Sequence, residues 1–263
     1  MTVATYLDHA ATTPMTAEVL AAYTSALTLV GNPASIHSQG QHAKRMLEEA
    51  REAVAHSVGA DPIEVTFTSG GTEAINLALK GLFWARNTAG AVAVPHGAAG
   101  RNRILSTRAE HHATIDSLDW LQQHEGAEID WIPVDPLGRI DLAALETALG
   151  DDVALITTLW ANNEVGTVQP ITEIVALAAA HGVPVHADAV GSYGSLPIDF
   201  RASGLTALSL SAHKIGGPVG VGALVTARGA TLIPLMHGGS QQRFRSGTQD
   251  AAGAAAFGVA ASA

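Results

Sequence analysis

The sequence predicts an α/β protein built on a doubly wound, mostly parallel β-sheet. Short runs such as Val153–Leu159 and Val183–Asp188 have the nearly continuous apolar character of strands that are covered on both faces. Segments with helical spacing of apolar residues separate these runs, and polar residues follow each run at its carboxyl end. This alternation is typical of doubly wound sheets, whose ligands bind in the crevice beyond the carboxyl ends of the strands.

The length and composition favour one dominant globular domain. The chain has 263 residues, of which 47% are hydrophobic and 14% charged. Its 14 Lys and Arg against 24 Asp and Glu give a net charge of -10, which argues against nucleic-acid binding. The absence of cysteine excludes disulfides, thiolate metal sites and a thiol nucleophile within this chain. We see no leader peptide and no apolar run long enough for a membrane span, so we expect a cytoplasmic protein without a membrane partner.

The elements follow from local spacing and from residues that stop helices. Thr16 is a helix N-cap, and Gly150 and Gly182 each end a helix. After an irregular arm, we expect helices after Thr16, over Gln41–Val58, over Ala74–Trp84, from Asp141 to Leu149 and over Glu173–His181, the last capped by Thr172, and a helical start in the tail to Ala263. The expected strands are Glu64–Thr68, Arg103–Thr107, Glu128–Pro133, Val153–Leu159, Val183–Asp188, one that ends at Leu210 and Val219–Val225. A surface loop is expected over Asn87–Arg101 and a polar loop over Arg243–Thr248.

An anion site is expected where the strand Glu64–Thr68 turns into the next helix. The turn contains Gly70, Gly71 and Thr72, and a glycine pair at a helix N-terminus leaves backbone N–H groups free to bind phosphate. The alternative is an ordinary cap and tight turn. The turn is not a Walker loop, because no Gly-Lys-Ser/Thr follows it.

A pair of histidines, His111 and His112, follows the strand that begins at Arg103. If the strand continues through them, the two rings point to opposite faces and cannot share a metal, so we expect no metal site there. That geometry fits better with one ring stacked flat over an aromatic ligand than with two rings that bind one metal. The alternative is a pair of solvated or otherwise satisfied histidines.

Three further polar residues follow apolar strands. Asn163 follows Val153–Leu159, and Asp188 ends the next strand. Lys214 follows the strand that ends at Leu210 and precedes the stop at Gly216. A lysine at a buried strand end has a lowered pKa, and the neutral amine forms Schiff bases with aldehydes. Taken alone, such a lysine is more often a solvated surface group.

Together these strand ends match what pyridoxal phosphate requires of a protein. The phosphate needs an anion seat, the ring needs a stacking partner, and the phenolate oxygen needs a donor. The pyridine nitrogen needs an anion, and the aldehyde needs an amine. The set is Gly71, Thr72, His111, Asn163, Asp188 and Lys214.

The chain resembles the class V aminotransferase family of fold-type I pyridoxal-phosphate enzymes, and more narrowly the cysteine desulfurases of the NifS/IscS type. The stretches that carry the resemblance are Tyr6–Pro14, Asn32–Ser38, Phe67–Glu73, Glu110–His112, Asn162–Pro170, His186–Asp188, Ser211–Pro218 and Arg245–Thr248. The resemblance implies an N-terminal arm over residues 1–15 and the large cofactor domain over 16–248. Residues 249–263 would begin a helix leading to the small C-terminal domain of relatives, which this sequence lacks.

The resemblance also implies roles for individual residues. Gly71, Thr72, Ser211 and His213 would bind the phosphate. His111 would stack on the ring, Asn163 would bond the phenolate oxygen and Asp188 the pyridine nitrogen. Lys214 would bind the aldehyde as a Schiff base and then move the substrate proton. Thr248 would reach the phosphate of the partner in a homodimer.

Three departures from the family pattern stand out. Gly191 replaces a glutamine that gives the phenolate oxygen a second hydrogen bond, and His9 replaces an asparagine. The missing donor is expected to loosen the ring or raise the pKa of the Schiff base. The mobile-loop cysteine and the substrate-binding arginine of relatives lie in the domain that this sequence lacks.

The expected activity is that of a cysteine desulfurase, which converts L-cysteine to L-alanine and passes sulfur to an acceptor for iron–sulfur cluster or thio-cofactor synthesis. The partners would be L-cysteine, a second copy of the chain and a sulfur-acceptor or iron–sulfur scaffold protein. One alternative is another class V reaction, such as transamination or selenocysteine lysis. The other is a truncated, non-catalytic subunit with the same fold.

Overall fold

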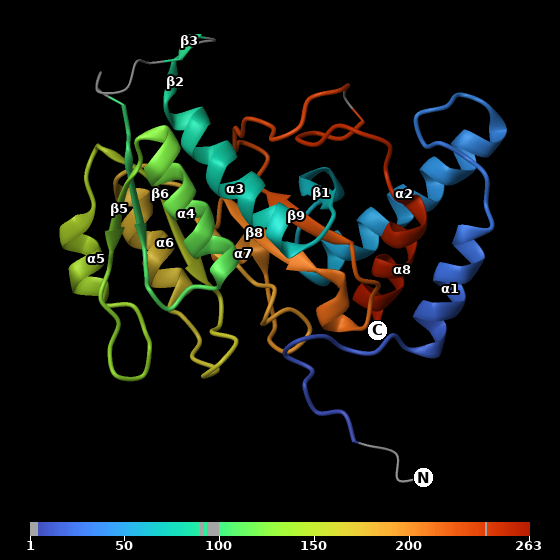
Figure 1. Ribbon diagram of the computed structural model, residues 1–263, viewed down its shortest axis with the longest axis horizontal. Coiled ribbons are helices and arrows are strands. Elements are labelled where there is room, and N and C mark those ends of the chain that lie inside the picture. The colour runs from blue at the N-terminus through green and yellow to red at the C-terminus, as the bar shows by residue number, and fades with distance from the viewer. Residues whose placement is uncertain (1–4, 90–91, 94–99, 240) are drawn as a thin grey trace.

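The computed structural model describes residues 5–89, 92–93, 100–239 and 241–263, and a seven-stranded sheet runs through its centre (Figure 1). The strand order is β1-β9-β8-β7-β6-β4-β5. The strands of this sheet are β1 Val65–Thr68, β4 Arg103–Ser106, β5 Glu128–Trp131, β6 Val153–Leu159, β7 Val185–Asp188, β8 Ala207–Ser211 and β9 Gly222–Thr226, and β2 Thr88–Ala89 pairs separately with β3 Val92–Ala93. The sheet therefore confirms the predicted fold class.

Strands β5, β4, β6, β7 and β8 are parallel, whereas β9 is antiparallel to both of its neighbours. A parallel crossover needs about a dozen residues or more, usually with a helix. The connection from Ser211 to Gly222 is shorter and contains only the 3₁₀ turn η2, Ala212–Ile215. The chain therefore reverses direction there, which places Lys214 in a turn at the carboxyl end of β8.

Helices cover both faces of the sheet (Figure 1). They are α1 Ala17–Leu27, α2 Ser38–Ser57, α3 Gly71–Arg86, α4 His112–Glu125, α5 Leu142–Ala148, α6 Ile171–Ala180, α7 Phe200–Ser203 and α8 Ala251–Ser262, with a 3₁₀ turn η1 at Pro62–Glu64. Helices α3 and α4 pack on one face through Ile75, Leu82 and Leu118. Helices α2, α5, α6 and α8 pack on the other, where Phe257 is fully buried.

The buried strands explain why sequence patterns located this sheet well. All seven residues of β6 are buried, as expected for a parallel strand that is covered on both faces. The predicted cap Thr16 is also confirmed, because its side chain accepts the Val19 N–H. Asp141, expected to open a helix, is the N-cap of α5 and accepts the N–H groups of Ala143 and Ala144. The prediction of Thr172 as a cap is wrong, since α6 begins at Ile171, two residues before the expected start, with Pro170 at its N-cap.

The predicted strand through the histidine pair is also wrong. Strand β4 ends at Ser106, and the Thr107 hydroxyl accepts the Ala109 N–H at 3.2 Å in the turn that follows. His111 is then the N-cap of α4, because its Nδ1 accepts the Ala113 N–H at 3.0 Å. The argument from opposite strand faces therefore does not apply to this pair. The predicted loop Asn87–Arg101 lies partly outside the described residues.

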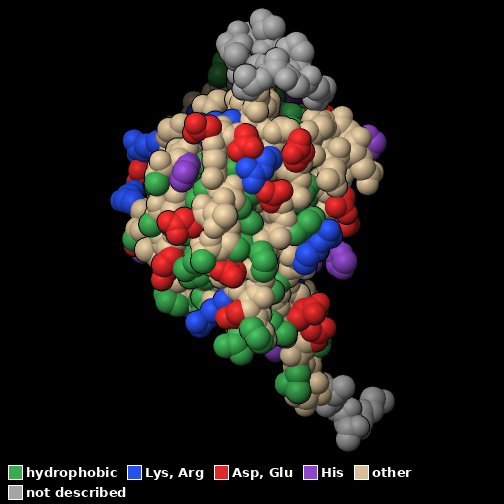
Figure 2. All heavy atoms as spheres, turned by 90° about the vertical axis from the view of Figure 1, so that its left-hand side faces the viewer, with side chains coloured by type: hydrophobic (Ala, Val, Ile, Leu, Met, Phe, Trp, Pro, Cys, Tyr) green, Lys and Arg blue, Asp and Glu red, His purple; other side chains and the backbone are tan. Residues whose placement is uncertain are grey.

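Charged side chains of both signs are interspersed on the face shown in Figure 2. Among the described residues, no helix is both long and apolar enough to span a membrane. Large apolar side chains are nevertheless exposed along the arm, on α1 and in the loop that follows α1. They include Leu7, Leu27, Val30 and Ile36.

Candidate active site

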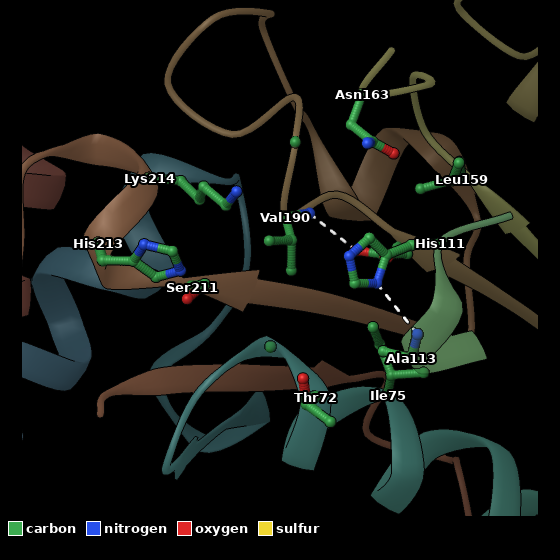
Figure 3. Close-up of a pocket in the computed structure, with 13 residues that line it drawn as sticks. Thr72, Ile75, His111, Ala113, Leu159, Asn163, Val190, Ser211, His213 and Lys214 are labelled. Atoms are coloured by element: carbon green, nitrogen blue, oxygen red, sulfur yellow. Dashed lines mark hydrogen bonds between the residues drawn. The ribbon is translucent and has the colours of Figure 1, made fainter. Parts of the chain in front are cut away.

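A pocket of about 230 Å³ opens at the carboxyl ends of β6, β7 and β8, and it gathers most of the predicted site residues (Figure 3). Eight of the nine line it: Gly71, Thr72, His111, Asn163, Asp188, Ser211, His213 and Lys214. The ninth, Thr248, is exposed on the loop before α8 and does not line the pocket. The remaining lining residues are Ile75, Ala113, Leu159, Val190 and Gly191.

Lys214 enters the pocket from η2 and is half-buried. Its Nζ donates hydrogen bonds to the carbonyl oxygens of Ala10 and Ala11, the latter at 3.1 Å. Burial lowers the pKa of the amine, although the carboxylates of Asp188 and Asp8 attract the charged form. The lysine is thus biased towards the neutral amine that reacts with an aldehyde.

Asp188 ends β7 and is 2% exposed. Its Oδ1 accepts the Val190 N–H at 2.9 Å. Burial raises the pKa of this carboxyl to about 6, although the Val190 N–H and the positive charge of Lys214 both favour the carboxylate. A buried carboxylate of this kind can accept a cationic N–H from a ligand in the pocket.

Beneath Asp188, His186 lies on the same face of β7 and is fully buried. Its Nδ1 is 2.9 Å from the Thr157 hydroxyl, and its Nε2 is 2.8 Å from the Ser209 hydroxyl. Burial lowers the pKa of this imidazole to about 3, so the ring is neutral at physiological pH. The neutral ring links β6, β7 and β8 directly behind the pocket.

His111 and Asn163 lie on the side of the pocket opposite Lys214 and His213 (Figure 3). The His111 ring is fixed by its bond to the Ala113 N–H, so it cannot turn freely. Partial burial lowers the pKa of this ring, and the positive charge of Lys214 adds to that effect. Asn163 is exposed at the rim, in the turn after β6.

The predicted anion seat lies at the first turn of α3, where Gly71 and Thr72 line the pocket. The first N–H groups of a helix have no intrahelical acceptor and carry the positive end of its dipole. A Cβ on Gly71 would lie 2.6 Å from Val190 Cγ2, so a larger residue would disturb the wall of the pocket. Ser211 and His213 line the same pocket from β8 and η2.

Three features of this region were not predicted from the sequence. The carbonyls that hold Lys214 belong to Ala10 and Ala11, and a backbone carbonyl has no sequence signature. Glu110 is 8% exposed and accepts the Thr107 hydroxyl at 3.0 Å. Its position before the His pair could have drawn attention to it, because a buried acid beside a predicted site is uncommon.

The third unpredicted feature is an ion pair at the anion seat. The Arg245 Nε lies 2.7 Å from Glu73 Oε1, which joins two stretches that are 172 residues apart. Both belong to motifs noted in the sequence, at Phe67–Glu73 and Arg245–Thr248. Only the tertiary structure brings them together.

Comparison with known proteins places this geometry in a family. The sequence profile of the class V aminotransferases matches residues 5–262. An IscS-like cysteine desulfurase of Mycobacterium tuberculosis is 51% identical over 259 residues, which cover 97% of this chain and 64% of the relative. A cysteine desulfurase IscS of Dictyoglomus turgidum is 42% identical over 257 residues, covering 97% of this chain and 62% of the relative.

Solved structures show the same fold. A NifS-like protein superposes with a TM-score of 0.90 at 34% identity and covers 98% of this chain and 68% of that one. SspA in complex with cysteine gives a TM-score of 0.89 at 34% identity, covering 98% of this chain and 72% of that one.

Enzymes of this family depend on pyridoxal phosphate, and the pocket fits that group chemically. Asp188 presents a buried carboxylate, Lys214 an amine with a lowered pKa, and the first turn of α3 an anion seat. These residues suit a pyridine nitrogen, an aldehyde and a phosphate, respectively. The cofactor would therefore be held by residues of α3, β7, η2 and the loop before α4.

The chain spans 64% and 62% of the two curated relatives compared above, so the match does not extend over their whole length. The family profile, in contrast, covers this chain almost from end to end. The chain belongs to the class V aminotransferase family.

Proposed function

We propose that this chain forms the cofactor-holding part of a cysteine desulfurase, which converts L-cysteine to L-alanine and transfers the sulfur to a thiol acceptor. The observation that carries the proposal is that Lys214 and Asp188 line one pocket together with an anion seat. The names of the similar proteins supply the substrate, because both curated relatives are called cysteine desulfurases.

Bound pyridoxal phosphate would supply an electron sink for the bond that breaks at the substrate Cα. Asp188 would hold the pyridine nitrogen protonated, and His111 would cover one face of the ring. The Lys214 Nζ would move a proton at the substrate Cα when it is not holding the aldehyde. The lowered pKa of that amine supports this role, because a general base works best when its pKa is near the working pH.

Sulfur transfer needs a thiol from outside these 263 residues, because they contain no cysteine. The C–S bond of L-cysteine breaks, a new S–S bond forms on the acceptor thiol, and protons return to the carbon skeleton. L-cysteine plus a thiol thus gives L-alanine plus a persulfide, and no external oxidant is required. We propose that a cysteine of a further segment of the same protein or of a second protein supplies this thiol, and that a sulfur-acceptor or iron–sulfur scaffold protein then receives the sulfur.

We also propose that the protein acts as a homodimer in which Thr248 completes the partner's phosphate site. Thr248 is exposed and lies outside its own pocket, which agrees with a role across an interface. The exposed apolar side chains of the arm and of the loop after α1, such as Leu7 and Val30, agree with a surface that is covered in the assembly.

The cofactor assignment can be tested by mixing the purified chain with pyridoxal phosphate and recording its visible absorption. We expect a protein-dependent band and, after borohydride reduction, a cofactor mass on the peptide that contains Lys214. Lys214→Ala should lose both signals, while Lys44→Ala, which changes an exposed lysine on α2, should keep them. Retention of the reduced adduct by Lys214→Ala would contradict the assignment.

The reaction can be tested with an amino-acid panel in the presence and absence of an added small thiol. With L-cysteine and the thiol we expect L-alanine and persulfide, and little turnover without the thiol. Lys214→Ala should reduce alanine formation by roughly 100- to 10,000-fold, as expected on removal of a proton-transfer group. Pyruvate or glutamate as the main product would favour transamination, and a normal rate of sulfide release without an added thiol would refute the need for an external acceptor.

A further inference from the structure

The first turn of α3, where we expect phosphate to bind, contains an acid, Glu73. An arginine on a distant loop, Arg245, pairs with this acid. Glu73 is the third residue of α3, so it belongs to the same helix turn as Gly71 and Thr72, whose N–H groups are expected to bind phosphate. Its Oε2 accepts the Ser69 N–H at 2.7 Å, and its Oε1 is 2.7 Å from the Arg245 Nε. Each oxygen therefore has a partner, and the Glu73 and Arg245 side chains are only 15% and 20% exposed, respectively.

A glutamate at this position is a common helix cap, and it often acts alone. Next to an anion site, however, an unpaired carboxylate would repel the ligand and compete with it for the positive end of the helix dipole. Arg245 removes that conflict by pairing with the carboxylate. The hydrogen bonds from Arg245 and from Ser69 also lower the pKa of Glu73 despite its burial, so the acid stays ionised and paired.

The loop that carries Arg245 is itself fixed to the edge of the sheet. The Gln242 side-chain amide bonds both backbone groups of Phe67 in β1, accepting its N–H at 2.8 Å and donating to its carbonyl at 3.0 Å. Gln241 accepts the Gly247 N–H at 3.0 Å and closes the same loop. Arg245 thus reaches Glu73 from a rigid base instead of from a freely moving segment.

We propose that Arg245 is a positioning residue of the anion seat, which neutralises and orients Glu73 so that the first turn of α3 can accept a phosphate group. This inference rests on the proposed binding of a phosphate-bearing cofactor. It does not require Arg245 to touch the ligand, because the effect passes through the Glu73 carboxylate and the Ser69 N–H.

The test compares pyridoxal phosphate with pyridoxal, which lacks the phosphate, on the full chain. We expect Arg245→Met to weaken pyridoxal phosphate binding roughly tenfold or more, because one buried charge loses its partner beside an anion. Pyridoxal affinity should change by less than about twofold, because no phosphate is involved. The double variant Glu73→Gln/Arg245→Met should recover most of the lost affinity, since it removes the repulsive charge as well.

Arg243→Met is the matched control in the same loop, since Arg243 donates to the carbonyls of Arg228 and Ala230 and stacks on Phe244. It should bind both ligands as the unmodified chain does. Equal affinity of Arg245→Met and the unmodified chain for pyridoxal phosphate would overturn the inference, as would equal losses for both ligands. Failure of the unmodified chain to bind pyridoxal phosphate would overturn the proposed function as well.

Discussion

Glu110 is a buried acid next to the pocket, at the carboxyl end of the sheet. Thr107 donates to its Oε1, and its Oε2 has no hydrogen-bond partner among the described residues. Burial raises the pKa of this carboxyl to about 8, and the neighbouring Asp188 adds to the effect. Glu110 is therefore mostly protonated in the folded protein at neutral pH. Asp188 shows the same direction of shift, to about 6.

The raised pKa of Glu110 determines in which direction the free energy of unfolding changes with pH. The folded state binds a proton more tightly than the unfolded state, whose carboxyl has the ordinary pKa of 4.5. The free energy of unfolding therefore falls as pH rises from about 4.5 through about 8, by at most about 1.4 kcal/mol per pH unit for one group. Above that pH window, the contribution of Glu110 to the free energy of unfolding no longer changes with pH.

We predict that Glu110→Gln, which resembles the protonated acid, gains stability relative to the unmodified chain as pH rises across that window. The amide carries no charge, so its burial does not become more costly with pH. The check is urea unfolding at a series of pH values between about 5 and 9. Glu146→Gln, at an exposed side chain on α5, is the control and should leave the pH dependence unchanged. Parallel pH curves for Glu110→Gln and the unmodified chain would contradict the raised pKa.

Gly191 replaces a glutamine of the family pattern, and the structure shows how the effect of this replacement can be tested. It lines the pocket, and a Cβ there would lie 3.4 Å from the Cβ of Asn163, a tight but tolerable contact. We predict that Gly191→Gln folds and binds pyridoxal phosphate more tightly, by roughly tenfold for one added charge-assisted donor. Titration of the visible band measures this, and weaker binding by a folded variant would show that the pocket has no room for the donor.

At the scale of elements, α8 is held against α2 by small residues. A Cβ on Gly258 would lie 2.8 Å from the Ala50 Cα, so the two helices approach closely at that point. This contact lets Phe257 enter the core, where its ring lies 6.3 Å from that of Phe67 and 6.2 Å from that of Tyr193. The packing explains why an alanine- and glycine-rich segment forms a stable helix here.

We predict that Gly258→Ala lowers the free energy of unfolding by about 1 to 3 kcal/mol, because the added methyl group meets backbone atoms that cannot move aside easily. Gly229→Ala is the control, since a Cβ at Gly229 meets nothing within 4 Å. Urea unfolding of both variants gives the comparison. Equal stability of the two variants would show that α2 and α8 can separate at little cost.

At the scale of the whole molecule, distant parts of the chain meet at the pocket. The arm contributes two carbonyls to Lys214, and the Thr13 N–H donates to the His213 carbonyl at 2.9 Å. The His213 Nδ1 also lies 3.1 Å from the Thr12 hydroxyl. The arm therefore belongs structurally to the site, although its described residues, from Thr5 onward, form no helix or strand.

The proposed homodimer predicts complementation between two defective variants. Thr248→Val should weaken pyridoxal phosphate binding, and Lys214→Ala should lose the covalent adduct. A mixed dimer contains one complete site, formed by Lys214 of one protomer and Thr248 of the other. Mixing the variants should therefore restore tight binding and the adduct in the Thr248→Val protomer. Absence of recovery in mixed dimers, isolated through an affinity tag carried by only one of the two variants, would contradict a shared site.

The sequence was sufficient to predict the fold class and eight of the residues that line the pocket, although Thr248 does not line it. Buried parallel strands read as apolar runs, and their ends are marked by polar residues, so Asp188 and Lys214 could be located without coordinates. Local signals also placed the anion turn at Gly71, because a helix N-terminus after glycine has a recognisable pattern.

The tertiary structure decided what local patterns do not encode. It showed that His111 caps a helix instead of continuing a strand, that the carbonyls of Ala10 and Ala11 hold Lys214, and that Arg245 pairs with Glu73. These features depend on backbone groups or on contacts between residues far apart in the chain. Burial and the alignment of charges strengthen these hydrogen bonds and this ion pair. Both conditions exist only after the chain has folded.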